Sequence, residues 1–250
     1  MAFLSTVTDQ FTYFATQIGQ ENWRGKNVLD FGGNVGNILR DRRSTIDHER
    51  YWCVDVDREA IDKGEALYPK AHWVFYDRLC FFFNPNGVRD LPLPDFRRKF
   101  DFIVAYSVFT NTPHREMIDL VAQLQKQLSR TGALAFTFIE PSYCSWEAGF
   151  KRNNFRWRLD LERDRGNISG NQIPKLIEKA KHASWFTLIN GSDLYIETDD
   201  IEAYGPGLQK TFHVFHTLNH MKKLFPQAIV LPPVNRAMQH CCVIRNWIES

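Results

Sequence analysis

The residues of this chain most able to bind a ligand are the glycines that follow an apolar strand expected at Val28–Phe31. Gly32, Gly33 and Gly36 can adopt positive φ or let the backbone approach a ligand closely, and an apolar helix face is expected just after them. Asp30 stands two residues before the first glycine. A strand, a glycine turn and a helix in this order indicate a site for a nucleotide-sized ligand. The glycine spacing differs from the G-x-G-x-x-G of dinucleotide sites and favours a different ligand.

The motif Asp-Phe-Gly-Gly-Asn-Val-Gly-Asn at residues 30–37 resembles the first motif of the class I S-adenosylmethionine-dependent methyltransferases, usually acid-x-Gly-x-Gly-x-Gly. Asn34 replaces the middle glycine, and asparagine tolerates positive φ better than most residues. The resemblance runs over residues 10–140 and resumes near the end of the chain. It implies a Rossmann-like enzyme that transfers a methyl group from S-adenosylmethionine to the oxygen, nitrogen or carbon of a small molecule, such as a specialised metabolite.

Acidic residues at the ends of the next two expected strands extend the cofactor site. Asp55 ends the strand Tyr51–Asp55, near the roughly 20-residue offset at which a carboxylate binds a ribose diol. Asp77 follows the strand 71–76, where the family places an acid that receives the adenine amino group; the alternative is a turn residue paired with Arg78. The residues that we expect to contact S-adenosylmethionine are Asp30, Gly32, Gly33, Asn34, Gly36, Asp55, Val56, Asp77, Arg78, Ser107 and Tyr13.

Two other segments resemble parts of the family that lie against the cofactor. The strand 100–107 ends at Ser107, whose small side chain leaves room for the methionine half. Many relatives have a histidine where Asn111 stands, so a role for that histidine does not carry over. Tyr13 lies in the segment 8–18, which resembles an aromatic lead-in that folds over the cofactor; the alternative is a plain helix packed on the sheet.

Methyl transfer needs little acid or base chemistry, because positioning in a site closed to water contributes several kcal/mol, on the order of a thousandfold in rate. If the acceptor must lose a proton, Glu140 is one candidate base, because it stands at the carboxyl end of the strand 133–139. Glu140 fits a turn-capping role beside Ser142 equally well.

Three histidines near the end of the insertion also invite a chemical role. His213, His216 and His220 are spaced three and four apart, and on a helix they would share one face. No cysteine or glutamate at matching separation completes a zinc site, so we expect no metal. His213 or His216 is instead a candidate catalytic base that enters the active site from the insertion.

The order of elements predicts an α/β fold. Apolar strands that alternate with helices favour a parallel sheet with helices on both faces. The resemblance implies a Rossmann-like, seven-stranded, mostly parallel sheet with an antiparallel last strand, and residues 227–231 and His240–Arg245 fit its last two strands. The expected methyltransferase core comprises residues 1–140 and 211–250.

Residues 141–210 then form an insertion between strands five and six. We expect it to cap the site and select the acceptor, with Tyr143 and Trp146 contacting the substrate. The alternatives are that its aromatic residues form only its own small core, and that its charged residues form an ordinary solvated surface.

Composition narrows the functional classes. With 250 residues, 44% of them hydrophobic, the chain suffices for one α/β core and an appendage. A net charge of +2 gives no reason to expect nucleic acid or a membrane, and the start of the chain lacks a secretory pattern, so we expect a cytoplasmic protein. The five cysteines show no C-x-x-C spacing, which favours reduced thiols. The oligomeric state is open. Alternative functions are a nicotinamide-dependent oxidoreductase and a cofactor-binding module without transfer activity.

Overall fold

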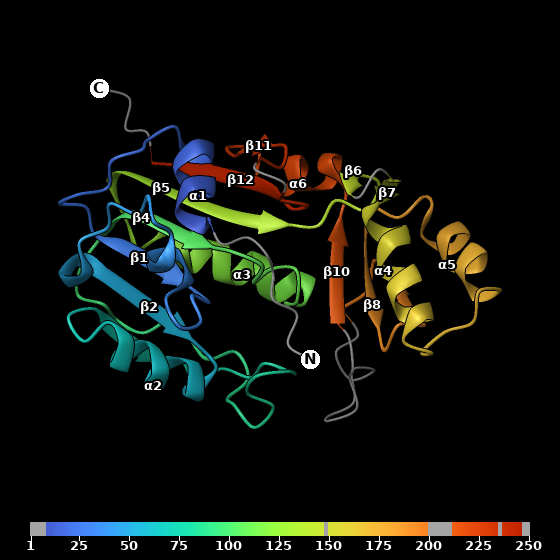
Figure 1. Ribbon diagram of the computed structural model, residues 1–250, viewed down its shortest axis with the longest axis horizontal. Helices are drawn as coiled ribbons and strands as arrows, with labels where there is room; N and C mark the ends of the chain where they lie inside the picture. The colour runs from blue at the N-terminus through green and yellow to red at the C-terminus, as the bar shows by residue number, and fades with distance from the viewer. Residues whose placement is uncertain (1–8, 148–149, 200–211, 235–236, 247–250) are drawn as a thin grey trace.

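The computed structural model describes residues 9–147, 150–199, 212–234 and 237–246 (Figure 1). Within these ranges, no helix is both long and apolar enough to cross a membrane. The core is built on one large sheet, whose strands are β1 (Val28–Phe31), β2 (Tyr51–Asp55), β3 (His72–Phe75), β4 (Phe100–Ala105), β5 (Leu128–Phe138), β11 (Ile229–Leu231) and β12 (His240–Arg245).

These seven strands lie in the order β11-β12-β5-β4-β1-β2-β3. The strands from β5 to β3 pair in parallel, whereas β12 runs antiparallel to both β5 and β11. The prediction of a mostly parallel sheet with an antiparallel last strand is therefore confirmed. Because the chain leaves β1 toward β2 on one side and returns to β4 on the other, the topological switch point lies between β1 and β4.

Different helices cover the two faces of the sheet. Val28 and Cys53 share an apolar cluster with α1 and α2, whereas their strand neighbours Leu29 and Val54 share another with α3 and α6. Successive residues of a strand point to opposite faces, so near-continuous apolar strands are what two covered faces require. The helices are α1 (Gln10–Ile18), α2 (Arg58–Leu67), α3 (His114–Gln125) and α6 (Leu218–Leu224).

The helix expected after the glycine turn is only a short 3₁₀ helix, Asn37–Arg40. Asp41, the next residue, is extended, and its carboxylate accepts the backbone N–H groups of Thr12 at 2.7 Å and Arg43 at 2.9 Å. These bonds hold the chain in an extended conformation against α1 and end the helix after one turn.

The residues after β5 form a second unit beyond the carboxyl ends of β4 and β5 (Figure 1). Three of its strands make an antiparallel sheet in the order β10-β8-β9, and β6 pairs with β7. The unit has an apolar cluster of its own, which includes Phe155, Phe186 and Phe215, so these aromatic rings serve as its core. Its elements are β6 (Cys144–Glu147), β7 (Phe150–Asn153), α4 (Asn154–Asp164), α5 (Gln172–Ala180), β8 (Trp185–Ile189), β9 (Asp193–Ile196) and β10 (Phe212–His216).

The expected end of the insertion, between residues 210 and 211, lies outside the described residues. The strand that follows, β10, pairs with β8 from Phe212 to His216, so the second unit continues at least to His216. His213 and His216 lie on β10, just before α6, and only His220 lies in α6, so the three histidines do not share a helix face. Aromatic and β-branched neighbours in this short run favour a strand.

Helix α2 packs against β3 so closely that Gly64 has no room for a side chain. A Cβ there would lie 2.2 Å from a ring carbon of Trp73, whose indole N–H is bonded to the carbonyl of Tyr68. Alanine normally favours a helix over glycine by about 1 kcal/mol. We predict that Gly64→Ala instead lowers the free energy of unfolding by about 1–3 kcal/mol through overpacking, measured by chemical denaturation. Gly170→Ala, where the nearest atom would be 4.0 Å away, is the control; equal stability of both variants would contradict the packing argument.

Candidate active site

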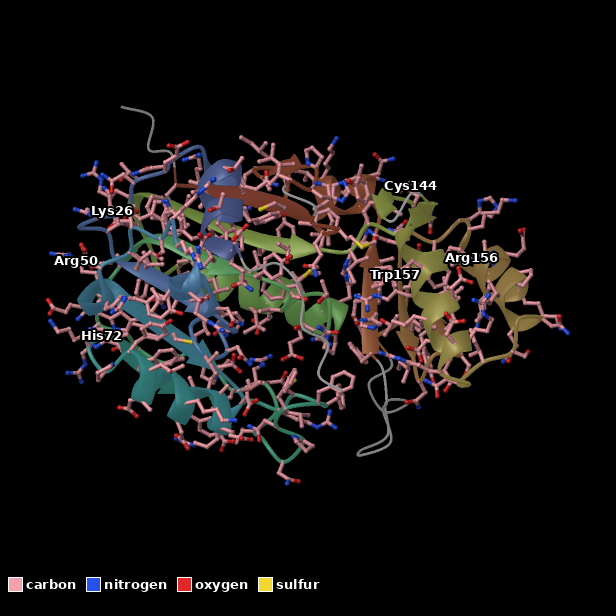
Figure 2. All side chains as sticks on the ribbon, viewed as in Figure 1. Lys26, Arg50, His72, Cys144, Arg156 and Trp157 are labelled. Atoms are coloured by element: carbon pink, nitrogen blue, oxygen red, sulfur yellow. The ribbon has the colours of Figure 1, made fainter. Side chains whose placement is uncertain are left out.

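The expected cofactor residues gather at the carboxyl ends of the core strands, on the side of the second unit. Figure 2 shows this polarity: Lys26, Arg50 and His72, near the amino ends of β1, β2 and β3, lie at one end of the molecule, and Cys144 and Trp157 of the second unit lie toward the other. Ligands of open α/β sheets bind outside the carboxyl ends, at the switch point.

The glycine turn contacts the loop after β4 directly. Gly32 has φ 73°, and a Cβ there would lie 2.4 Å from Cγ2 of Val108. Asn34 takes φ 53°, the left-handed conformation that its place in the motif requires. The turn and the loop that begins at Ser107 therefore flank the switch point between β1 and β4. No side chain fits between them at Gly32.

Asp30 supports the turn from beneath. Its buried carboxylate accepts a hydrogen bond from the Tyr51 hydroxyl at 2.7 Å, and a Cβ on Gly33 would lie 2.5 Å from its Oδ2. Burial raises the pKa of Asp30 to about 7. The side chain thus positions the backbone of the turn, and a direct contact between Asp30 and a cofactor stays a prediction.

Asp55 connects the turn to the end of β2. Its Oδ2 accepts the backbone N–H of Asn34 at 2.8 Å, and its Oδ1 accepts that of Asp57 at 2.9 Å. Burial raises the pKa of the Asp55 carboxyl. A carboxylate offers about four lone-pair sites, so acceptor capacity remains for a ribose diol. Val56, the next residue, packs partly buried against the apolar cluster on the α3 side of the sheet.

Asp77 and Arg78 point to different surroundings. Asp77 is exposed and accepts a hydrogen bond from the Asn84 amide at 2.9 Å. The buried guanidinium of Arg78 instead binds the carboxylate of Glu116 on α3 and the carbonyl of Leu91. The alternative pairing of Asp77 with Arg78 is therefore wrong. Asp77 remains free to receive an adenine amino group, whereas the contacts of Arg78 anchor the loop after β3 to α3.

Ser107 and Tyr13 are joined by a residue that sequence reasoning missed. Ser107 has φ 61°, and its hydroxyl accepts a hydrogen bond from the Gln239 amide at 3.1 Å. The buried Tyr13 donates its hydroxyl to the backbone carbonyl of Gln239 at 3.0 Å. Gln239 directly precedes β12, and only the order of strands β12, β5 and β4 brings it here. No local pattern marks it.

The candidate bases have defined partners. Glu140 accepts the Ser142 hydroxyl on both carboxylate oxygens, at 2.7 and 2.9 Å, which is the turn-capping arrangement. His213 and His216 fall on opposite faces of β10, because they stand three positions apart and side chains alternate along a strand. His213 lies near Arg158 and Arg165, whose charges add to burial in lowering its pKa. A catalytic role for any of the three stays a prediction.

His216 belongs to a cluster of imidazoles between the core and the second unit. Its Nε2 lies 3.1 Å from Nδ1 of His114, at the start of α3, and the His220 ring lies 5.0 Å from that of His114. Trp185 of β8 stacks on His114 at 4.0 Å. Burial is the largest cause that lowers the pKa of each histidine, to about 4 for His114. Among the described residues, no group of three or more His, Cys, Asp or Glu side chains could hold a metal ion.

The two expected substrate residues lie at the start of the second unit. The half-buried ring of Tyr143 meets that of His240 edge-on at 5.1 Å. Trp146 lies on β6, where it pairs with Lys151 of β7. Asn154 then ties the first turn of α4 to the core, donating to the carbonyls of Glu140 at 2.9 Å and Met238 at 3.0 Å. Substrate contact by Tyr143 or Trp146 stays a prediction.

Comparisons with known proteins agree with this architecture. Residues 29–134 match a family model described as a methyltransferase domain. The fold is similar to that of the glycopeptide N-methyltransferase MtfA complexed with sinefungin (8% identity, 96% of this chain and 94% of that chain covered, TM-score 0.53). It is also similar to that of CalS10, an amino pentose methyltransferase from Micromonospora echinaspora with bound S-adenosylmethionine (11% identity, 98% and 93% covered, TM-score 0.53).

A third solved structure of the same fold is an S-adenosylmethionine-dependent methyltransferase from Clostridium acetobutylicum (11% identity, 94% of this chain and 89% of that chain covered, TM-score 0.50). No curated protein sequence matches the chain. Residues 29–134 thus match a methyltransferase domain, and the chain shares its fold with S-adenosylmethionine-dependent methyltransferases, which agrees with the resemblance of the motif at residues 30–37.

The imidazole cluster makes stability depend on pH in a defined window. Because folding lowers the pKa of His114 from 6.5 to about 4, the unfolded chain binds more protons between these values, and stability falls as the pH drops through them. A single such group contributes up to about 1.4 kcal/mol per pH unit. We predict that His114→Gln makes the loss of melting temperature between pH 6.5 and 4.5 shallower than in the wild type. The exposed His182, changed to Gln, is the control; parallel curves for all three proteins would contradict the assignment.

Proposed function

We propose that this protein transfers a methyl group from S-adenosylmethionine to a small-molecule acceptor that enters between the core and the second unit. The observation that carries the proposal is the carboxylate of Asp55, bonded to the backbone of Asn34 in a glycine turn at the switch point. This places an acid and a side-chain-free backbone surface side by side, which suits a ribose and the chain attached to it.

The residues fit the cofactor in two respects. As glycines, Gly32 and Gly33 place no side chain between the backbone of the turn and a ligand. Asp55 retains acceptor capacity for the ribose hydroxyls, and Asp77 is exposed for the adenine amino group. When bound, S-adenosylmethionine supplies a methyl group already activated by its sulfonium. The protein therefore has to orient the two reactants and exclude water.

The second unit is proposed to cover the acceptor. Support comes from β10, whose residues Val214 and His216 donate backbone hydrogen bonds to the carbonyls of Thr110, at 2.9 Å, and Ile139, at 3.0 Å. The unit thus rests on both the loop after β4 and the end of β5. Aromatic rings face the core there: Phe81 of the loop after β3 lies 5.8 Å from Phe212. An apolar acceptor fits these surroundings.

The identity of the acceptor is proposed only as a class. The neighbours MtfA and CalS10 are named for a glycopeptide and an amino pentose, which supports a small molecule such as a specialised metabolite. A cytoplasmic location is part of the proposal. A nicotinamide-dependent oxidoreductase is the less favoured alternative, because the chain lacks the G-x-G-x-x-G spacing of dinucleotide sites. The other alternative, a binding module without transfer activity, would bind S-adenosylhomocysteine but show no turnover.

We predict that Asp55→Ala weakens the binding of S-adenosylhomocysteine ten- to more than a hundredfold, because a lost charge-assisted hydrogen bond typically costs about 1.5–3 kcal/mol. Titration calorimetry measures the dissociation constant. Asp55→Asn keeps one acceptor oxygen, so its affinity for S-adenosylhomocysteine should lie between those of the wild type and Asp55→Ala. Asp57→Ala is the matched control, since Asp57 caps α2 through the N–H of Ala60 at 3.2 Å. Unchanged affinity in Asp55→Ala, or tight binding of NADH by the wild type, would rule out the assignment.

A second prediction concerns the cover. Tyr143→Ala and Trp146→Ala should lower turnover with a panel of small-molecule acceptors while the dissociation constant for the cofactor changes by less than about threefold, or roughly 0.7 kcal/mol. Release of S-adenosylhomocysteine, cofactor affinity and melting temperature are measured on the same variants. A purely stabilising appendage predicts lower melting temperatures with normal turnover, and that result in both variants would reject the cover.

A further inference from the structure

Gln239 lies at the edge of the sheet where β4 and β5 end and β12 begins. It directly precedes β12, and its side chain crosses the carboxyl end of β5 to reach Ser107, two residues beyond the end of β4. Its Oε1 accepts the hydroxyl of Thr137, and its Nε2 donates to the hydroxyl of Ser107 at 3.1 Å. One amide therefore spans the edge of the sheet where the cofactor is proposed to bind.

The hydrogen bonds around Gln239 form one consistent set of donors and acceptors. Thr137 Oγ1 accepts the backbone N–H of Ser107 at 2.7 Å, which leaves its own proton for Gln239. Ser107 Oγ accepts from Gln239, which leaves its proton for Thr110 Oγ1 at 3.1 Å. Thr110 in turn donates to the carbonyl of Ser107 at 2.9 Å. Each hydroxyl in this chain has a single consistent role, so the arrangement is rigid.

This chain holds Ser107 in a conformation that a serine rarely adopts. At φ 61° a residue with a Cβ is strained, and the N–H, carbonyl and hydroxyl of Ser107 are all bonded. The conformation matters because the next residue, Val108, is the one that contacts Gly32 of the glycine turn. Ser107 therefore sets the spacing between the turn and the loop after β4.

The backbone beside Gln239 joins two further elements to the same point. Its carbonyl accepts the hydroxyl of Tyr13 in α1 at 3.0 Å, and the carbonyl of Met238 accepts the Asn154 amide at the start of α4 at 3.0 Å. The segment before β12 thus contacts the amino-terminal helix, the second unit and the loop after β4. Gln239 thus links Ser107 to all three elements through hydrogen bonds of adjacent residues.

We infer that Gln239 is a positioning residue for the methionine half of S-adenosylmethionine. Its amide holds Ser107 in place, and Ser107 in turn fixes the distance between the glycine turn and the loop after β4, between which the ligand binds. The inference deepens the proposed function and rests on it. It assigns a role to a residue that lies outside the motif and contacts the turn only through the loop.

The test compares two glutamines that form hydrogen bonds to or from the connection between β11 and β12. Gln239→Met keeps the length of the side chain and removes both of its hydrogen bonds. Gln17→Met is the matched control, because Gln17 of α1 donates to the carbonyl of Pro232, in the connection between β11 and β12, at 2.8 Å. Titration calorimetry with S-adenosylhomocysteine and thermal melting are measured on both variants. We expect about a tenfold weaker dissociation constant for Gln239→Met and less than a twofold change for Gln17→Met, at similar losses of melting temperature.

Thr137 supplies a second, independent pair of variants, which decides the matter if Gln239→Met does not fold. Thr137→Val removes the hydroxyl that both accepts from Ser107 and donates to Gln239, whereas Thr137→Ser keeps it. Affinity should fall about tenfold in the valine variant and recover in the serine variant.

The possible results separate the inference from the proposed function. Wild-type protein that does not bind S-adenosylhomocysteine overturns both. Wild-type protein that binds, together with unchanged affinity in Gln239→Met and Thr137→Val, overturns only the role of Gln239. Equal weakening in Gln239→Met and Gln17→Met overturns it too, because general destabilisation then explains the loss.

Discussion

The structure of the cofactor edge depends on a backbone approach that leaves no room for side chains. A Cβ on Gly32 would collide with Val108 at 2.4 Å, and one on Gly33 with the Asp30 carboxylate at 2.5 Å. The turn is thereby held between the end of its own strand and the loop after β4. Asp55 fixes the third side by accepting the N–H of Asn34. The proposed ligand-facing surface is consequently made largely of positioned backbone, and the polar side chains around it hold that backbone in place.

The second unit depends on the same loop. Its strand β10 is bonded to the carbonyl of Thr110, only three residues from Ser107, and to that of Ile139 at the end of β5. The cofactor edge and the proposed cover therefore share one short segment of chain. The buried imidazoles of His114 and His216 lie between the two units and are stable there only when neutral, because burial penalises the charged form. We therefore expect acid to weaken the contact between the core and the second unit.

Much of the fold could be predicted because buried parallel strands have a local signature. Val28–Phe31, Tyr51–Asp55 and His240–Arg245 are short apolar runs, and the structure forms strands over these same residues. The glycine turn could be predicted because it lies within the motif at residues 30–37, and Asp55 because it follows that motif at the usual offset of about 20 residues. The contacts of Gln239 with Ser107 and of His114 with His216 could not, since 132 and 102 residues separate the partners and no local pattern records the pairing.

The central claim is that S-adenosylmethionine binds on the glycine turn, against the loop after β4. Hydrogen exchange of the wild-type protein with and without S-adenosylhomocysteine tests it most directly, since backbone amides close to a bound ligand exchange more slowly. The account predicts protection over residues 30–37 and 107–112, with little change near Lys26, Arg50 and His72 at the opposite end of the strands (Figure 2). Unchanged exchange in both segments at saturating ligand, or protection confined to the amino ends of the strands, would contradict it.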